Sequence, residues 1–228
     1  MTPLCIKLTI TLETALSVGA GGSAGTLADK SIARDGWNRP IIPGSQVKGK
    51  VRYAAEQILR GLSQNIPTPF DEPALVERAN PIRTLFGSPQ LRSSLHFHDL
   101  PGIIGSLETQ QAETLRRQSE QHQSQIRPSV AINRRRGIAE DARLLFQETT
   151  LEGIQFFAER AITGTVPDLP HAALVWAALK LTTRWGGAKS RGLGWATVRT
   201  TVMVGDQKLT EADLQQALRD LLQNMRSG

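Results

Sequence analysis

The clearest pattern in the chain is an alternation of apolar and other residues close to the N-terminus. Five apolar residues occupy every second position: Leu4, Ile6, Leu8, Ile10 and Leu12. Because successive side chains of a strand point to opposite faces of a sheet, this spacing predicts a strand with one buried face. Further along, strand-like residues 30–34, the turn signal Asp35-Gly36 and the pair Ile41-Ile42 predict a hairpin.

Three segments have the periodicity of a helix. Pro43-Gly44-Ser45 breaks the preceding strand and supplies an N-cap, and apolar residues then recur at helical spacing over 45–61. A second amphipathic helix is predicted between Pro170 and Trp185, where Gly186-Gly187 stops it. A C-terminal helix is predicted over 210–225.

The remaining patterns predict strands and two insertions. Strands are expected over 93–99, around Val130 and Ile132, over 149–162 and over 195–204. Residues 106–126 form a polar insertion rich in Gln, Glu, Ser and Arg, which reads as a solvated helix or a disordered excursion. The order of elements predicts one domain over 1–228 of the α+β class, with a ferredoxin-like β-α-β-β-α-β core.

Charge and composition narrow the class of partner. Lys plus Arg number 27 against 21 Asp plus Glu, for a net charge of +6 and a pI near 10.0, which suggests a polyanionic partner. The single Cys5 excludes an internal disulfide, and four His residues without tight ligand spacing beyond His96 and His98 argue against structural zinc. No apolar run is long enough to cross a bilayer, so we expect a cytoplasmic protein without membrane contact.

One glycine-and-basic segment lies at the start of the first predicted helix. Gly44 to Lys50 satisfies G-x-x-x-x-G-K, but Val51 stands where a phosphate-binding loop needs Ser or Thr for Mg²⁺, so nucleotide hydrolysis is disfavoured. A helix N-terminus beside Lys48, Lys50 and Arg52 can still hold a phosphate. The alternative is an ordinary capped helix with a solvated basic face.

A second such segment runs from Gly186 to Gly194, where four glycines bracket Lys189, Ser190 and Arg191. A helix C-cap needs one glycine, whereas this loop can lay N–H groups and two cations along a phosphate run. Such contacts bind nucleic acid without reading its bases. The earlier small-residue stretch Gly19 to Ala24 matches G-x-G-x-x-A but leads into a strand, so a dinucleotide site is not expected there.

Five pieces of the sequence occur in an order that resembles one known family. They are VGAGG, IIPGSQVKGKVR, LFGS with SSLHFHDL, VAINRRRGIAE and GGAKSRGLGW. The chain resembles the RAMP superfamily of CRISPR-associated proteins, and within it the backbone subunit of type III effector complexes. The resemblance implies an RNA-recognition-motif-like fold that polymerises along a guide RNA, with other effector subunits and a target RNA as further partners.

The resemblance also implies roles for individual residues. A protruding thumb-like loop would span 132–146 and interrupt guide–target pairing. The implied RNA-binding residues are Gly21, Gly22, Ser45, Lys48, Lys50, Arg52, Arg134, Arg135, Arg136, Lys189, Ser190 and Arg191. In the related subunits an aspartate after the first glycine segment cleaves target RNA with a divalent metal such as Mg²⁺. Its pattern of an Asp, an apolar residue, a basic residue and an Asp is matched by Asp29, Ile32, Arg34 and Asp35.

Asp29 is therefore the predicted catalytic and metal-binding residue, with RNA phosphates supplying other ligands. Asp35, before Gly36, is read as turn chemistry. The alternatives are a non-catalytic scaffold subunit, a metal-independent guide-processing ribonuclease that uses His96 or His98, and a nucleotide-binding enzyme that uses Gly44 to Lys50.

Overall fold

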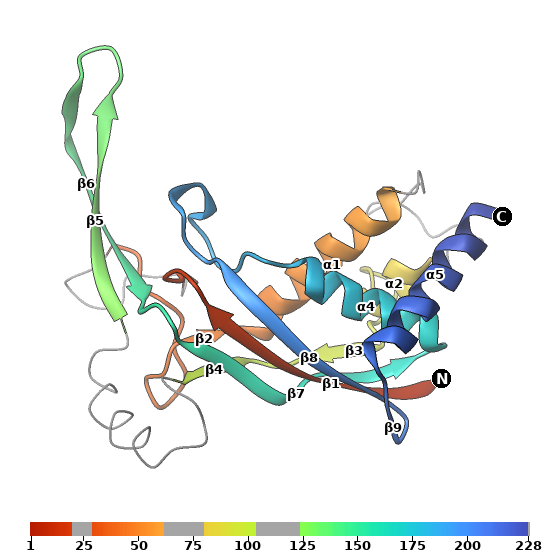
Figure 1. Cartoon of the computed structure of the whole chain (residues 1–228). Coiled ribbons are helices and arrows are strands. Elements are labelled where there is room, and N and C mark those ends of the chain that lie inside the picture. The colour runs from red at the N-terminus through yellow and green to blue at the C-terminus, as the bar shows by residue number, and fades with distance from the viewer. Residues whose placement is uncertain (20–28, 62–79, 104–123, 228) are drawn as a thin grey trace.

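The core of the protein is one antiparallel sheet, seen in a computed structural model that describes residues 1–19, 29–61, 80–103 and 124–227 (Figure 1). From one edge the strand order is β2, β4, β7, β1, β8, β9, and β3 also pairs with β7. The strands are β1 Thr2–Leu12, β2 Ile41–Ile42, β3 Leu95–Phe97, β4 Leu100–Ile103, β7 Gln155–Val166, β8 Ala196–Val204 and β9 Gln207–Lys208.

β1 lies at the centre of this sheet, between β7 and β8. Its five alternating apolar residues are all buried, and the residues between them stay partly exposed. The predicted strand with one buried face is therefore confirmed. The central position follows from this pattern, because a strand with a continuous apolar face contributes most when it has neighbours on both sides.

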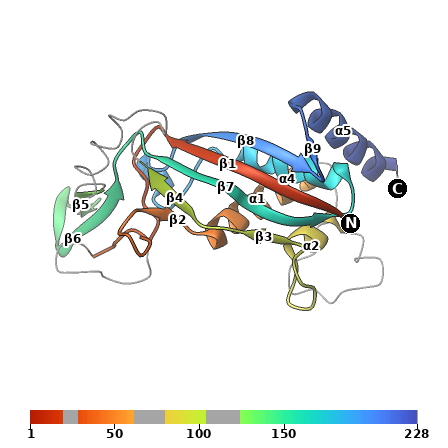
Figure 2. The same ribbon diagram turned by 90° about the horizontal axis from the view of Figure 1, so that it is seen from below.

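The described helices lie on one face of the sheet (Figure 2). α1 (Gly44–Arg60) and α4 (Leu169–Leu181) pack on the buried face of β1, and their apolar residues join its core cluster. α5 (Glu211–Ser227) packs against α4, and the short α2 (Pro81–Phe86) lies beside α1. No helix within the described residues is long and apolar enough to span a membrane.

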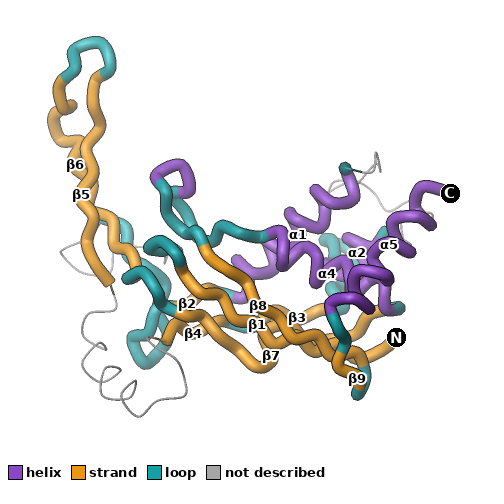
Figure 3. Tube along the Cα trace, in the orientation of Figure 1, coloured by secondary structure: helices purple, strands orange, loops and turns teal. Residues whose placement is uncertain are grey.

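A two-stranded hairpin projects from one end of the molecule (Figures 1 and 3). Its strands are β5 (Ser124–Asn133) and β6 (Ile138–Thr150), which form a two-stranded sheet of their own, and Gln147 of β6 also forms an isolated bridge with Lys30. The segment predicted as a thumb-like loop, 132–146, thus forms the outer part of a β-hairpin whose register shifts between Val130 and Ile132. Residues 124–126 of the predicted polar insertion belong to β5, and 104–123 lie outside the described residues.

Helices together with antiparallel strands confirm the predicted α+β class. The predicted strand over 149–162 is wrong, because β6 ends at Thr150 and β7 begins at Gln155. Between them Gly153 adopts φ 75° and its N–H donates to Leu12 O at 3.1 Å, so the chain turns from the hairpin into the main sheet. A run of strand-forming residues gives no signal for such a turn.

Two predicted helix boundaries also need correction. α1 begins at Gly44 after the N-cap Pro43, which offers no side-chain acceptor, so Ser45 is a helical residue. α4 ends at Leu181, well before Gly186-Gly187, because Thr182 leaves the helix and its hydroxyl donates back to Ala178 O at 2.8 Å.

The hairpin predicted over 30–42 also needs correction. Within this segment one bridge forms, between Arg34 and Pro40, while β2 pairs with β4.

Candidate nucleic-acid interface

The two glycine-and-basic segments, far apart in the sequence, meet in the structure. The loop of residues 186–194, here called the glycine loop, lies against the side of α1, where Gly186 N–H donates to Gln46 Oε1 at 3.3 Å. Within the loop, residues 189–191 form a single 3-10 turn. The fold therefore brings the cations of both segments to one place.

The junction between them is formed by Lys50 of α1 and Lys189 of the glycine loop. Burial, together with the neighbouring Lys189 ammonium, lowers the pKa of Lys50 from 10.5 to about 8. Among the described residues neither lysine forms an ion pair with a carboxylate. Two adjacent cations without a counterion form a site that an anion would stabilise.

The shape of the glycine loop is held by the segment that follows β1. Gly187 N–H donates to Ser17 O at 2.7 Å, and Gly194 N–H donates to Ala15 O at 2.9 Å. Gly186 has φ 68°, and a Cβ there would lie 2.6 Å from Ser17 O, so a side chain would push the loop off this segment. At least this glycine serves the fold of the loop rather than contact with a ligand.

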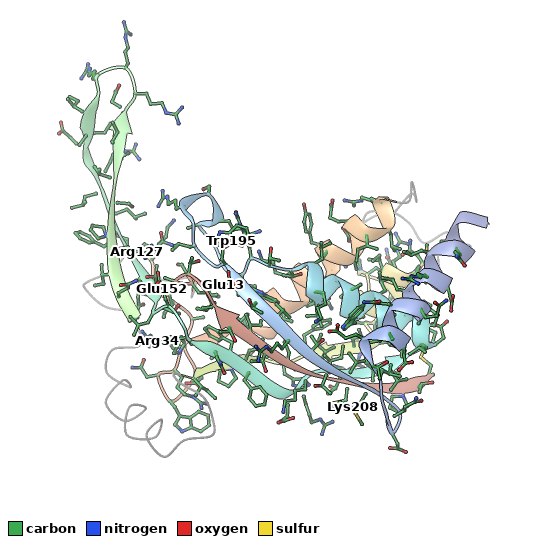
Figure 4. All side chains as sticks on the ribbon, in the orientation of Figure 1. Glu13, Arg34, Arg127, Glu152, Trp195 and Lys208 are labelled. Atoms are coloured by element: carbon green, nitrogen blue, oxygen red, sulfur yellow. The ribbon has the colours of Figure 1, made fainter. Side chains whose placement is uncertain are left out.

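The outer residues of the loop are open to solvent. Lys189, Ser190 and Arg191 are all exposed. At the base of the loop, the Arg184 guanidinium lies 3.7 Å from the ring centroid of Trp195, a cation–π contact that joins the two ends of the loop (Figure 4). Both segments thus present cations on a fixed backbone.

The three predicted basic residues of α1 do not share one face. An α-helix turns about 100° per residue, so Lys48 and Arg52 lie on one flank and Lys50 lies on the other. Arg52 is half-buried and committed to the fold, with Nε 2.9 Å from Glu56 Oε1 and Nη1 donating to Gly87 O at 3.2 Å. Lys50 alone of the three faces the glycine loop.

The N-terminus of α1 is partly occupied by the protein itself. Gly44 N–H donates to Asp99 Oδ1 at 2.8 Å, so a carboxylate takes the place that the sequence analysis left for a phosphate. Ser45, one residue further, remains exposed. Because Asp99 already accepts the Gly44 N–H, this contact supports neither of the two ways in which residues 44–50 could bind a phosphate. One was a nucleotide-binding loop, and the other was a free helix N-terminus.

The predicted catalytic residue, Asp29, lies at the base of the hairpin. Its N–H donates to Phe146 O at 2.9 Å, and its Oδ2 accepts the N–H of Phe146 at 2.8 Å. The Asp29 carboxylate is exposed, and its second oxygen has no hydrogen bond to a described residue. The structure thus presents one carboxylate oxygen to solvent beside the point where the hairpin leaves the core.

An ion pair ties the same segment to the hairpin. Arg34 Nη2 lies 2.6 Å from Glu148 Oε1, and Glu148 Oε2 accepts the N–H of Ile32 at 3.0 Å. Burial raises the pKa of Glu148, but hydrogen bonds from Ser124, Arg34 and Ile32 outweigh this effect and hold it below its ordinary value. Arg34, read in the sequence only as part of a catalytic pattern, is therefore a structural residue that positions the hairpin.

Ser17 links the hairpin to the glycine loop, and the sequence analysis missed it. Its hydroxyl accepts the Gln147 side-chain amide at 2.8 Å, while its carbonyl accepts Gly187 N–H. Ser17 and Gln147 are both buried. Since the two residues lie 130 positions apart, no local pattern connects them.

Asp35 has the role in a turn that its place before Gly36 predicts. Its Oδ1 accepts the N–H groups of Trp37 and Arg39, and its Oδ2 lies 2.7 Å from Arg39 Nε. Burial raises the pKa of this carboxyl, and the bonds to Arg39 and Trp37 lower it by more. Among the described residues no group of three His, Cys, Asp or Glu side chains could hold a metal ion.

The remaining predicted residues lie apart from the junction. Arg134, Arg135 and Arg136 occupy the exposed tip of the hairpin, where Asn133 Oδ1 accepts the N–H groups of Arg135 and Arg136. Gly21 and Gly22 lie outside the described residues. His96 and His98 are exposed near β3, and His98 Nε2 lies 3.0 Å from Thr163 Oγ1.

Solved structures with a similar fold include chains of Type III-B Cmr-beta. One chain of the type III-B Cmr-beta complex in its apo state is 14% identical, has a TM-score of 0.59, and the match covers 86% of this chain and 97% of that one. A chain of the same type of complex bound to cognate target RNA is 13% identical, with a TM-score of 0.58 and coverage of 86% and 96%. At sequence identities of 13% and 14%, the similarity to these chains is evidence for a shared fold alone.

The family follows from the sequence itself. The model of the RAMP superfamily matches residues 9–197, which is most of the chain. The protein belongs to the RAMP superfamily, and the predicted resemblance is confirmed at that level. No curated protein matches the sequence.

Proposed function

We propose that this chain is a backbone subunit of a type III CRISPR effector complex and that it holds a guide RNA by its sugar–phosphate backbone. The observation that carries the proposal is the Lys50–Lys189 pair, two neighbouring ammonium groups without a carboxylate partner among the described residues. A phosphate placed between them would compensate both charges. Contacts of this kind position an RNA strand and leave its bases free to pair.

The fold supports this assignment. β8, β1, β7 and β3 lie side by side in that order, α1 precedes β3 in the sequence, and α4 connects β7 to β8. This is the arrangement of a ferredoxin-like β-α-β-β-α-β core, which we infer for the chain. The similar chains of Cmr-beta complexes have this overall shape, one of them in a complex with cognate target RNA.

Assembly with copies of itself and with other effector subunits is part of the proposal. The hairpin extends away from the core and leaves several large apolar side chains exposed: Ile126, Val130, Ile132, Ile138, Leu144 and Phe146. A two-stranded hairpin is marginally stable by itself, and exposed apolar side chains on it favour contact with a partner.

We also propose that Asp29 takes part in cleaving target RNA. Asp29 Oδ2 is fixed by Phe146 N–H, and Oδ1 would hold a divalent metal together with RNA oxygens, because the described residues contain no group of three His, Cys, Asp or Glu side chains that could complete a metal site. Such a metal would stabilise negative charge on the phosphate group. A scaffold without catalysis is the alternative, and the Asp29 variant described below separates the two.

Loss of RNA binding in the lysine variants tests the main proposal. Lys50→Gln and Lys189→Gln each remove one charge from the junction, and each should weaken binding of a labelled single-stranded RNA of mixed sequence about tenfold. Lys208→Gln is the matched control, since Lys208 is exposed at the opposite end of the sheet (Figure 4). Equal affinities for all three variants and the parent protein would overturn the proposal.

A further inference from the structure

Gly49 stands at the outermost point of α1, where the packing of the chain gives no reason for glycine. The inner side of the helix is marked by Val47, Val51 and Ala54, all buried. Gly49 is exposed on the opposite side, and a Cβ added there would meet nothing within 4 Å. Glycine within a helix costs about 1 kcal/mol relative to alanine, so its presence at an open helical position lacks a structural explanation.

Cationic sites flank Gly49 on both sides. On one flank lies the Lys50–Lys189 pair. On the other flank, a hollow of about 440 Å³ between α1 and the segment 92–97 is lined by Ser45, Lys48 and Arg92. Because Lys48 and Lys50 lie about 200° apart around the helix, Gly49 falls midway between the two flanks on the solvent side.

The hollow beside Lys48 has the charge of an anion site. It continues into a second hollow of about 300 Å³ that shares Lys48 and Arg92, and no carboxylate lines either of them. Burial and the neighbouring Arg52 lower the pKa of Lys48, yet no ion pair with a described carboxylate compensates its charge. Arg92 is exposed and likewise lacks an ion pair among these residues.

We infer that the RNA backbone crosses α1 directly over Gly49, with one phosphate at Lys50 and Lys189 and a further phosphate in the hollow of Lys48 and Arg92. This inference rests on the proposed RNA binding and specifies the path of the strand. The absence of a side chain at Gly49 lets the sugar–phosphate backbone touch the helix, as glycine does where a ligand approaches closely. Gly49 is then a positioning residue. It lowers the stability of the helix in the free protein, and the contact with RNA offsets this loss in the complex.

Two substitutions at Gly49 test this path, because stability and binding should change in opposite directions. Gly49→Ala should raise the Tm of the free protein by about 2–4 °C, since alanine favours the helix by about 1 kcal/mol. The same variant should weaken binding of labelled single-stranded RNA of mixed sequence, and Gly49→Leu should weaken it about tenfold. Gly36→Ala is the control, because Gly36 also has open space around its Cβ position but lies in the turn of Asp35, outside α1.

Charge variants on the second flank distinguish this inference from the proposed function. Lys48→Gln and Arg92→Gln should each weaken RNA binding, and each should reduce the dependence of log Kd on log salt by about one unit. If Lys50→Gln and Lys189→Gln weaken binding while the Lys48, Arg92 and Gly49 variants do not, the crossing path is wrong and RNA binding stands. If Lys48→Gln and Arg92→Gln affect only a guide–target duplex, the hollow holds the second strand, which also overturns the path. If none of these variants changes binding, the proposed function fails as well.

Discussion

The junction of α1 with the glycine loop and the β5–β6 hairpin are the two regions to which we assign a function, and they are stabilised in different ways. At the junction, the exposed Lys189 and the half-buried Lys50 lie on elements that are held by the core and by hydrogen bonds to the backbone. In the hairpin, the base is fixed by Ser17 and Glu148, but the outer strands have apolar side chains without a partner in the described chain. The junction is thus preorganised for a ligand, and the hairpin depends on assembly for cover.

The largest effect is expected from Asp29, the proposed catalytic group at the hairpin base. Asp29→Asn keeps the acceptor for Phe146 N–H but removes the charge, so cleavage of target RNA by the assembled complex should fall at least about 100-fold. Guide binding and assembly should not change. Undiminished cleavage in a complex that contains this variant would leave the chain as a scaffold subunit.

Breaking the ion pair at the base of the hairpin should have the next largest effect. Arg34→Ala leaves the half-buried Glu148 carboxylate without its partner, and we expect a loss of about 1–3 kcal/mol in stability, with faster amide exchange in β5 and β6 than in β1. Arg127→Ala is the control, since Arg127 lies 3.9 Å from Glu152 and both side chains are largely exposed. That variant should change stability by less than about 0.5 kcal/mol. Similar exchange rates in both variants would show that the Arg34 pair does not hold the hairpin.

The pH dependence of RNA binding tests the charge of Lys50 at the junction. Because Lys50 has a pKa of about 8 in the free protein, its charge is lost as pH rises through that value, and RNA affinity should fall between pH 7 and 9. Lys50→Arg should remove this dependence, since arginine stays protonated. An unchanged pH profile in that variant would assign the titration to another group.

The same pKa determines the sign of a stability effect. The unfolded chain keeps Lys50 protonated up to its ordinary pKa of 10.5, so between about pH 8 and 10.5 the unfolded state binds more protons than the folded state. The contribution of Lys50 to stability therefore rises with pH in this window. Urea unfolding of the parent protein and of Lys50→Gln, each at pH 7 and pH 9.5, measures this contribution. The variant should be more stable than the parent at pH 7, and the difference in stability should be smaller at pH 9.5.

The smallest effect is expected from the outer apolar residues of the hairpin. Ile132, Ile138 and Leu144 are 61%, 57% and 57% exposed, so substitution by serine should change the stability of the free chain by less than about 0.5 kcal/mol. If the hairpin docks on another subunit, the same variants should weaken assembly. Size-exclusion chromatography of the complex, beside thermal unfolding of the free chain, measures both. A large loss of stability in the free chain would mean that these side chains are already packed.

Local signals predicted the centre of the fold well. The alternation in β1 and the helical spacing of α1 each follow from side chains that face one core, and glycine marks the loop after α4. The boundaries were less predictable, because Thr182 ends α4 through a side-chain bond and the α2 helix begins at the Asn80 cap within a proline-rich connection. Such short-range capping competes with weak helix propensity and is easily overlooked.

The site was predictable only as separate pieces. Charge and glycine content marked Lys50 and Lys189, but nothing in the sequence shows that they adjoin or that Lys48 and Arg52 face away from them. Gln46, Ser17 and Arg92 carry no local signal, because their contacts or hollows are made with residues far along the chain or on other elements. The contact of Asp99 with the N-terminus of α1 was also not predictable, because Asp99 lies 55 residues after Gly44 in the sequence.

The central claim is that Lys50 and Lys189 hold the same RNA phosphate, and a double-mutant cycle tests it most directly. The Kd for labelled single-stranded RNA is measured for the parent protein, Lys50→Gln, Lys189→Gln and the double variant, at one pH and salt concentration. If both ammonium groups serve one phosphate, the double variant should lose clearly less binding free energy than the sum of the two single losses. Losses that add fully, or the absence of any loss, would contradict a shared phosphate site.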